Sequence, residues 1–213
     1  MRTIVALPGD GIGKIVLPEA IRLLNAAGFN ADYVWGDIGW EFWCKEGNAL
    51  PQRTIDLIAK HKIALFGAIT SKPKDAADKE LNPELQGKGF TYYSPIVSLR
   101  QIFNLDICIR PCISFIGNPL NFIRKKIDGT FEEPFVNVVV FRQNTEGLYA
   151  GVEWTNPPKQ VRDALETHPK MKAFADVPSE EMAISTRIVT KKASERIIRA
   201  AFEYARRYGY KRS

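Results

Sequence analysis

Short apolar runs alternate with amphipathic stretches through the first third of the chain. The runs are rich in Val, Ile and aromatic residues, which pack well on a pleated surface, so they have the character of buried strands. Glycine and proline residues punctuate the segments between them. Strand and helix therefore alternate, which predicts an α/β layer with parallel strands. The expected strands lie at 3–7, 31–35 and 63–66, and the expected helices at 14–27, 40–45 and 51–60.

Regular patterns are sparser further along. The pattern predicts a helix over 94–104, a strand over 105–110 that Pro111 stops, a strand over 136–141 and a final helix over 191–208. A cap at Thr190 and a stop at Gly209 frame that last helix. The other segments are expected to be a polar loop at 71–92, irregular chain at 113–133, and a proline-rich arm at 153–177 with a strand within 182–189.

The composition narrows the classes of ligand. The 213 residues carry a formal net charge of +6, yet their basic residues form no tract longer than pairs. A small anionic ligand is therefore favoured over nucleic acid. The three cysteines are odd in number and lack metal or redox spacing, which fits a reduced, cytoplasmic protein. No apolar run is long enough to span a bilayer and no signal-peptide pattern is found, so we expect no membrane association.

Arginines near the ends of predicted elements are the main candidates for chemistry. Arg110 and Arg142 each end a predicted strand, Arg100 shares a predicted helix with Ser94, and Tyr149 follows Arg142 by seven residues. Ligands of α/β sheets bind at the carboxyl ends of strands. Each charge-assisted hydrogen bond from a guanidinium contributes about 1.5–3 kcal/mol. The pattern leaves two interpretations open: a pocket for a polycarboxylate, or separate surface arginines.

Other candidate motifs are weaker. The turn Pro8–Gly13 misses both glycine-rich phosphate-binding patterns, and a tight strand-to-helix turn explains its glycines. His61 and His168 have no metal-ligand neighbour at helical spacing. We therefore assign no metal-binding residue in this sequence.

Four motifs, in their order and spacing, resemble the β-decarboxylating dehydrogenases, a family that holds isocitrate, homoisocitrate and 3-isopropylmalate dehydrogenases. The resemblance covers the whole chain. Gln143 departs from it, because the family usually has glutamate there; we expect little effect. The motifs are Pro8–Gly13, Ser94–Arg100, Ile109–Pro111 and Arg142–Tyr149.

The resemblance implies a role for each candidate residue. Arg100, Arg110 and Arg142 would hold the carboxylates of a 2-hydroxy acid, and Ser94 would bond the distal carboxylate. Tyr149 would be the catalytic residue that protonates the enolate carbon. In addition, Thr70 would lie near the nicotinamide of NAD or NADP.

The implied reaction is hydride transfer to the dinucleotide followed by loss of CO2, with help from Mg2+ or Mn2+. The metal ligands are expected outside this sequence. Ser94 favours isocitrate as the substrate, whereas the apolar Ile96 leaves homoisocitrate and 3-isopropylmalate as alternatives. A non-catalytic regulatory subunit is the alternative of another class.

The resemblance also implies an architecture. We expect the isopropylmalate dehydrogenase-like two-domain α/β fold, which is not a Rossmann fold, in an incomplete form that is inactive alone. Residues 1–98 would belong to the large cofactor-binding domain and 99–213 to the smaller substrate and dimerisation domain. An arm at 153–189 would clasp a second copy in a homodimer.

Overall fold

The chain folds into two compact units, Met1–Phe103 and Asn104–Ser213. The structure is a computed structural model that describes residues 2–211, except for the side chains of Lys74 and Asp75. The expected division after residue 98 would fall inside helix α5 (Pro95–Ile102), which the first unit keeps whole. The roles expected for the two domains stay predictions.

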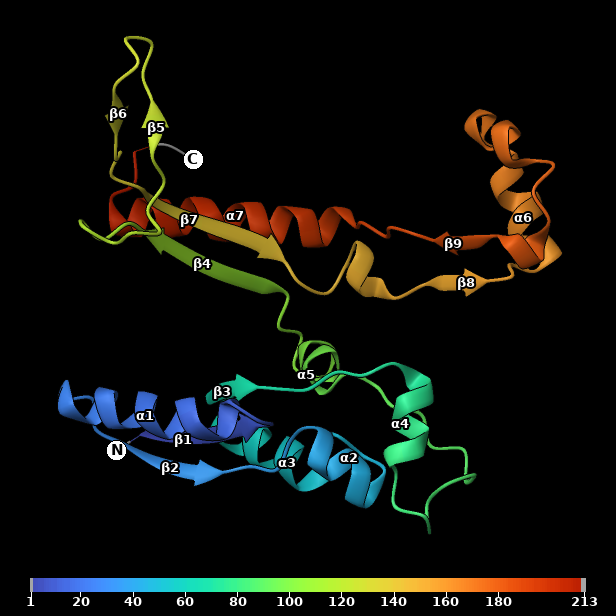
Figure 1. Ribbon diagram of the computed structural model, residues 1–213, viewed down its shortest axis with the longest axis horizontal. Coiled ribbons are helices and arrows are strands. Elements are labelled where there is room, and N and C mark those ends of the chain that lie inside the picture. The colour runs from blue at the N-terminus through green and yellow to red at the C-terminus, as the bar shows by residue number, and fades with distance from the viewer. Residues whose placement is uncertain (1, 212–213) are drawn as a thin grey trace. The chain divides into compact units, whose positions relative to one another are not determined.

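A three-stranded parallel sheet forms the centre of the first unit (Figure 1). Strand β1 (Arg2–Gly9) lies between β2 (Ala31–Trp35) and β3 (Ala64–Ala68), and both pairings are parallel. Residues 4–7 of β1 are buried on both sides, as expected for a central strand. The predicted parallel α/β layer is therefore confirmed.

Helices pack on this sheet because alternate side chains of β1 point to opposite faces. Val5 and Leu7 pack in one core cluster with Ile58 of α3 (Gln52–His61) and Leu99 of α5. Helix α1 (Gly13–Ala26) packs against β1 and β3. Helix α2 (Trp40–Glu46) lies between β2 and α3 in the sequence.

The segment 71–92 is not a simple polar loop, so that expectation was wrong. It contains helix α4 (Lys74–Glu80), and Ala77 and Leu81 are buried in a second core cluster with Trp43. The spacing of four residues puts both apolar side chains on one face of a single helical turn. The Trp43 indole N–H donates to the Ala77 carbonyl at 2.9 Å, which fixes this segment further.

The second unit is built on an antiparallel pair, β4 (Ile107–Ile113) and β7 (Asn137–Gln143). Pro111 was expected to stop this strand. Instead it lies within β4, opposite Val139. In a two-stranded sheet each strand has one open edge, where proline's missing N–H costs no ladder bond. Helix α7 (Lys191–Tyr208) packs on β7 through a ring contact of 5.3 Å between Tyr204 and Phe141.

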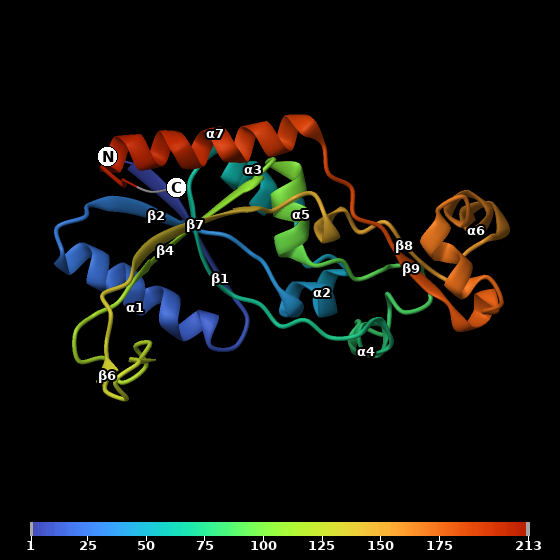
Figure 2. The ribbon, with the colours of Figure 1, turned by 90° about the horizontal axis from the view of Figure 1, so that it is seen from above.

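Two ribbons extend from this pair. The segment expected to be irregular forms a short hairpin, β5 (Arg124–Lys125) with β6 (Phe131–Glu132). The expected arm contains an antiparallel ribbon that leads away from α7 to α6, as Figures 1 and 2 show. The arm consists of β8 (Glu153–Thr155), α6 (Lys159–Glu166), the short helices η2 (Pro169–Phe174) and η3 (Ser179–Glu181), and β9 (Ala183–Ser185).

Candidate substrate site

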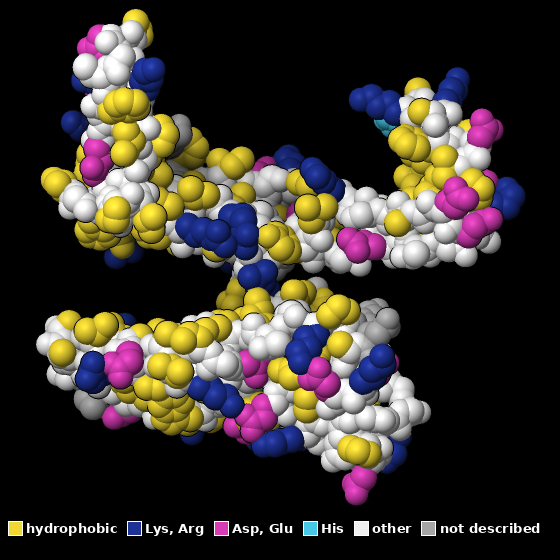
Figure 3. All heavy atoms as spheres, viewed as in Figure 1, with side chains coloured by type: hydrophobic (Ala, Val, Ile, Leu, Met, Phe, Trp, Pro, Cys, Tyr) yellow, Lys and Arg dark blue, Asp and Glu magenta, His cyan; other side chains and the backbone are white. Residues whose placement is uncertain are grey.

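Arg110 and Arg142 lie on the same face of the β4–β7 pair. In the register, Arg142 is opposite Cys108 and Arg110 is opposite Val140, so the two arginines are diagonal neighbours across the strands. Phe141, whose side chain alternates with that of Arg142, points to the other face, where α7 packs. Figure 3 shows basic side chains gathered over β4. The pairing therefore brings two guanidinium groups together, away from the helix-covered face.

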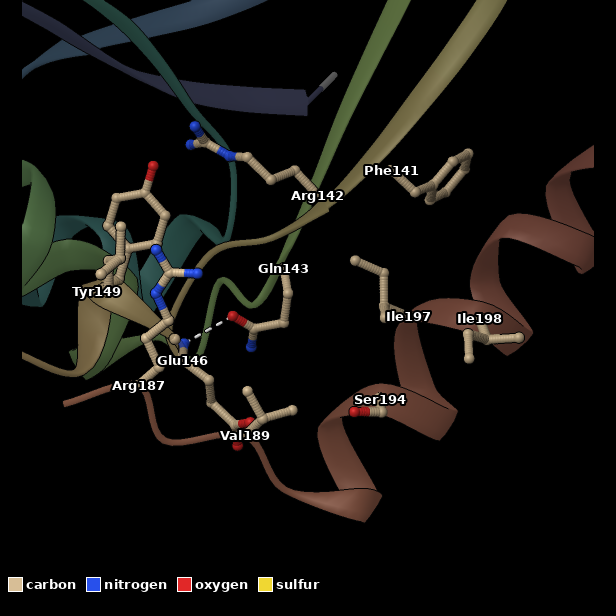
Figure 4. A pocket seen from close by; sticks show the side chains of 12 residues that line it. Phe141, Arg142, Gln143, Glu146, Tyr149, Arg187, Val189, Ser194, Ile197 and Ile198 are labelled. Carbon is tan, nitrogen blue, oxygen red and sulfur yellow. Dashed lines mark hydrogen bonds between the residues drawn. The ribbon is translucent and has the colours of Figure 1, made fainter. Parts of the chain in front are cut away.

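Tyr149 lies against Arg142. The tyrosine belongs to the short helix η1 (Leu148–Ala150), and its ring centre is 5.0 Å from the central guanidinium carbon of Arg142 (Figure 4). This distance is within the range of a cation–π contact. The predicted catalytic residue and one predicted carboxylate ligand thus share one site.

The Nε of Arg142 lacks an acceptor within the part of the chain that the structure describes. Its Nη2 donates to the Asn144 side-chain oxygen at 2.8 Å, whereas its buried Nε has no hydrogen-bond partner among residues 2–211. Buried donors are nearly always satisfied in folded proteins. A guanidinium donates in a planar fork that matches a carboxylate. Because the Nε is covered by protein, an anionic ligand would be bound through the other N–H groups of this half-buried guanidinium.

Asn144 orients Arg142, a role that the sequence analysis missed. It is buried, with 8% of its surface exposed. Its side-chain amide donates to the Leu105 carbonyl at 3.2 Å, and its backbone N–H donates to the Asp106 carbonyl at 2.9 Å. Asn144 thus fixes the end of β7 to the chain just before β4 while it accepts from Arg142.

The turn between Arg142 and Tyr149 is held at both ends. Gln143 Oε1 accepts the backbone N–H groups of Thr145 at 2.8 Å and Glu146 at 2.6 Å. The Glu146 carboxylate in turn accepts from the backbone N–H and the hydroxyl of Thr190, at 2.8 and 2.7 Å. Thr190 also caps α7, as predicted, by accepting from the Ala193 N–H. The turn that leads to Tyr149 is therefore anchored to the start of α7.

A pocket of about 640 Å3 opens between this turn and α7. Its polar lining includes Arg142, Tyr149, Glu146 and Arg187 (Figure 4). Arg187 follows β9 and was not singled out from the sequence, where nothing distinguished it from the other basic residues. Within residues 2–211 no ion pair joins Arg110, Arg142 or Arg187 to a carboxylate. The positive charge of these three arginines is consequently available to attract an anion.

Arg110 is exposed and lies beside the Cys108 side chain. The interaction with this sulfur raises the pKa of Arg110, and Tyr149 makes a smaller electrostatic contribution in the same direction. Cys108 is a free cysteine, half-buried between the positions of the two arginines. Tyr149 therefore lies near Arg110 as well as packing against Arg142.

The other three predicted residues belong to the first unit. Ser94 is the N-cap of α5, although its side chain makes no capping hydrogen bond, and Arg100 lies in the last turn of the same helix. Thr70 follows β3, and its backbone N–H donates to Asp10 at 3.0 Å. The structure thus brings Arg110, Arg142 and Tyr149 together, whereas the convergence of the remaining three with them stays a prediction.

Metal ligands are not gathered in the part of the chain that the structure describes. Among these residues, no group of three or more His, Cys, Asp or Glu side chains could hold a metal ion. The same residues contain no helix that is long and apolar enough to cross a membrane.

Comparison with known proteins shows the family of the chain. The sequence pattern of the isocitrate/isopropylmalate dehydrogenase family matches residues 3–212. The chain belongs to this family.

The similarity extends to individual relatives. The homoisocitrate dehydrogenase of Methanocaldococcus jannaschii is 39% identical over 207 residues, which are 96% of this chain and 48% of that protein. Protein DlpA of Legionella pneumophila is 36% identical over 209 residues, 98% of this chain and 31% of its own length. The crystal structure of isocitrate dehydrogenase from Methylococcus capsulatus superposes with a TM-score of 0.70 at 33% identity and covers 98% of this chain. The chain spans less than half the length of each of these proteins.

Proposed function

We propose that this chain forms the carboxylate-binding side of an NAD(P)-dependent β-decarboxylating dehydrogenase that acts on isocitrate. One observation carries the proposal: Arg110 and Arg142 share a sheet face, and the Arg142 guanidinium lies 5.0 Å from the ring of Tyr149. Two guanidinium groups beside a phenol suit a polycarboxylate that exchanges a proton during its reaction.

Each residue of the chain has a distinct part in the proposed reaction. Arg110 and Arg142 bind the carboxylates and orient the substrate, with Arg142 held in place by Asn144. Tyr149 exchanges a proton, through its hydroxyl, with the carbon that loses CO2. When bound, the dinucleotide would accept the hydride and a divalent cation would polarise the new carbonyl.

Isocitrate remains the favoured substrate. Ser94, at the start of α5, supplies a hydroxyl for the distal carboxylate. The apolar Ile96 was the reason to consider a substrate with a longer or more apolar tail. However, this residue packs against the core cluster of the first unit. Its apolar character therefore has a structural cause. Homoisocitrate is the second candidate, because the relative from Methanocaldococcus jannaschii carries that activity in its name.

A homodimer is the proposed assembly. The ribbon of β8 and β9 has only two strands, and such ribbons are rarely stable alone. Both of its outer edges are therefore suited to pairing with the arm of a second copy. Sedimentation velocity of the chain, with and without residues 153–189, measures this directly: loss of the arm should turn dimers into monomers.

Calorimetric titration with the three acids tests the proposed substrate. We expect isocitrate to bind more tightly than homoisocitrate or 3-isopropylmalate, and Arg142→Gln to weaken binding at least tenfold. Arg207→Gln is a matched control, because Arg207 stacks on Tyr208 at 5.7 Å but does not line the pocket at Tyr149. Equal binding by the two variants, or tighter binding of 3-isopropylmalate, would refute the assignment.

A regulatory subunit is the second candidate function, and Tyr149→Phe separates it from a catalytic one. In an assembly that contains the chain and turns over isocitrate, a catalytic chain should lose turnover while it still binds the acid. A regulatory chain should instead alter only the apparent substrate affinity of its partner.

A further inference from the structure

Two side chains hold Thr70 by its backbone. The Thr70 N–H donates to Oδ2 of Asp10 at 3.0 Å, and its carbonyl accepts from the Tyr92 hydroxyl at 3.3 Å. These contacts come from the turn after β1 and from the segment before α5. Among the groups that the structure describes, which leave out the side chains of Lys74 and Asp75, the Thr70 hydroxyl makes no hydrogen bond. The backbone is therefore fixed on both sides while the side chain keeps its hydrogen-bonding capacity.

Asp10 is itself held in place. It is 8% exposed and accepts the backbone N–H groups of Trp40 at 2.7 Å and Glu41 at 3.3 Å. A Cβ on Gly39, whose φ is +116°, would come within 2.5 Å of the carboxylate. Glycine at this position thus makes room for the carboxylate, which joins α2 to Thr70.

Tyr92 is fixed by aromatic packing. Its ring centre lies 4.9 Å from that of Trp40 and 5.4 Å from that of Trp43. Burial raises the pKa of Tyr92, so its hydroxyl keeps its proton and can donate at neutral pH. Both partners of Thr70 are thus rigid, as groups that position a ligand contact need to be.

We propose that Asp10 and Tyr92 are positioning residues that present the Thr70 hydroxyl to the carboxamide of a bound nicotinamide. The inference rests on the proposed function. A hydroxyl can both donate and accept, as the amide N–H2 and the carbonyl of a carboxamide require. Thr70 also follows the carboxyl end of a parallel strand, where ligands of α/β sheets bind.

The test measures NADH affinity through energy transfer from the tryptophans to bound dihydronicotinamide. Tyr92→Phe removes one hydroxyl and should weaken binding about threefold, the loss of one modest hydrogen bond. Tyr93→Phe is the control, because its exposed hydroxyl reaches only Gln101 at 3.4 Å and should leave affinity unchanged.

The Thr70→Val background distinguishes positioning from a general effect on the fold. If Tyr92 acts through Thr70, Tyr92→Phe should cause no further loss there. The same loss in both backgrounds, or equal affinities of the Tyr92 and Tyr93 variants, overturns this inference and leaves the proposed function standing. The measurements are made in an assembly that contains the chain and turns over isocitrate; if the unmodified chain shows no energy transfer to NADH there, the proposed function fails and the inference fails with it.

Discussion

Asn144 offers a perturbation that separates the stability of the site from its charge. Its side-chain oxygen accepts from Arg142 at 2.8 Å, and its amide donates to the Leu105 carbonyl at 3.2 Å. Asn144→Ala removes both bonds. Asn144→Asp keeps an acceptor for Arg142 but places a negative charge beside the guanidinium that we propose to hold the substrate.

The structure sets the size of each effect. A bond from a charged donor contributes about 1.5–3 kcal/mol and a neutral one about 0.5–1.5 kcal/mol. Arg142 is half-buried and can recover part of its bond from water. Asn144→Ala should therefore lower the free energy of unfolding by about 2 kcal/mol. Asn144→Asp should cost less stability, because an ion pair to Arg142 offsets the lost bond to Leu105.

Binding should follow the opposite order. The new carboxylate of Asn144→Asp competes with the ligand for Arg142, so we expect isocitrate affinity to fall more than tenfold, and further than in Asn144→Ala. Urea unfolding and calorimetry measure the two quantities. Asn118→Asp adds the same charge in an exposed turn and controls for net charge. Tight isocitrate binding by Asn144→Asp would refute the placement of the substrate at Arg142.

Two further predictions concern charged groups that do not line the pocket. Arg196→Met leaves the buried carboxylate of Asp106 without the guanidinium that lies 2.6 Å from it. This change should lower the free energy of unfolding, measured by urea denaturation, by about 1–3 kcal/mol. Adding Asp106→Asn to the variant should largely relieve the loss, because no buried charge is then left unpaired. Hydrogen bonds from Lys14, then Lys45, lower the pKa of Glu41 to about 2. The stabilisation of the fold by these two bonds is therefore complete above the ordinary glutamate pKa of 4.5 and is lost as the pH falls towards 2. A pH titration of the Glu41 carboxyl carbon by NMR should accordingly give a midpoint near 2.

Elements with strong local signals were predicted well from the sequence. The apolar runs of the parallel sheet and the cap and stop of α7 are encoded within a few residues. Helix α4 was missed because its buried Ala77, and Leu81 directly after it, sit among charged neighbours. Their burial depends on the tryptophans of α2, a tertiary contact that no local pattern reveals.

The candidate site, too, was predicted from the sequence only in part. Strand ends identified Arg110 and Arg142, but only the register places them on one face, since a slip of one residue would turn one of them towards α7. Asn144 and Arg187 carried no signal that distinguished them in the sequence. Their roles arise from the contact of Asn144 with the chain before β4 and from the return of the arm beside Tyr149.

The contacts of Gln143 explain why glutamine can replace the family's usual glutamate at this position. Its carbonyl oxygen accepts the N–H groups of Thr145 and Glu146, which a carboxylate would also do. Its amide N–H2 donates to the Thr145 hydroxyl at 2.9 Å; with a carboxylate the freely rotating hydroxyl could donate instead. Gln143→Glu should therefore preserve the turn. However, it adds a negative charge next to Arg142 in sequence, so any loss of anion affinity in this variant would report on charge rather than on geometry.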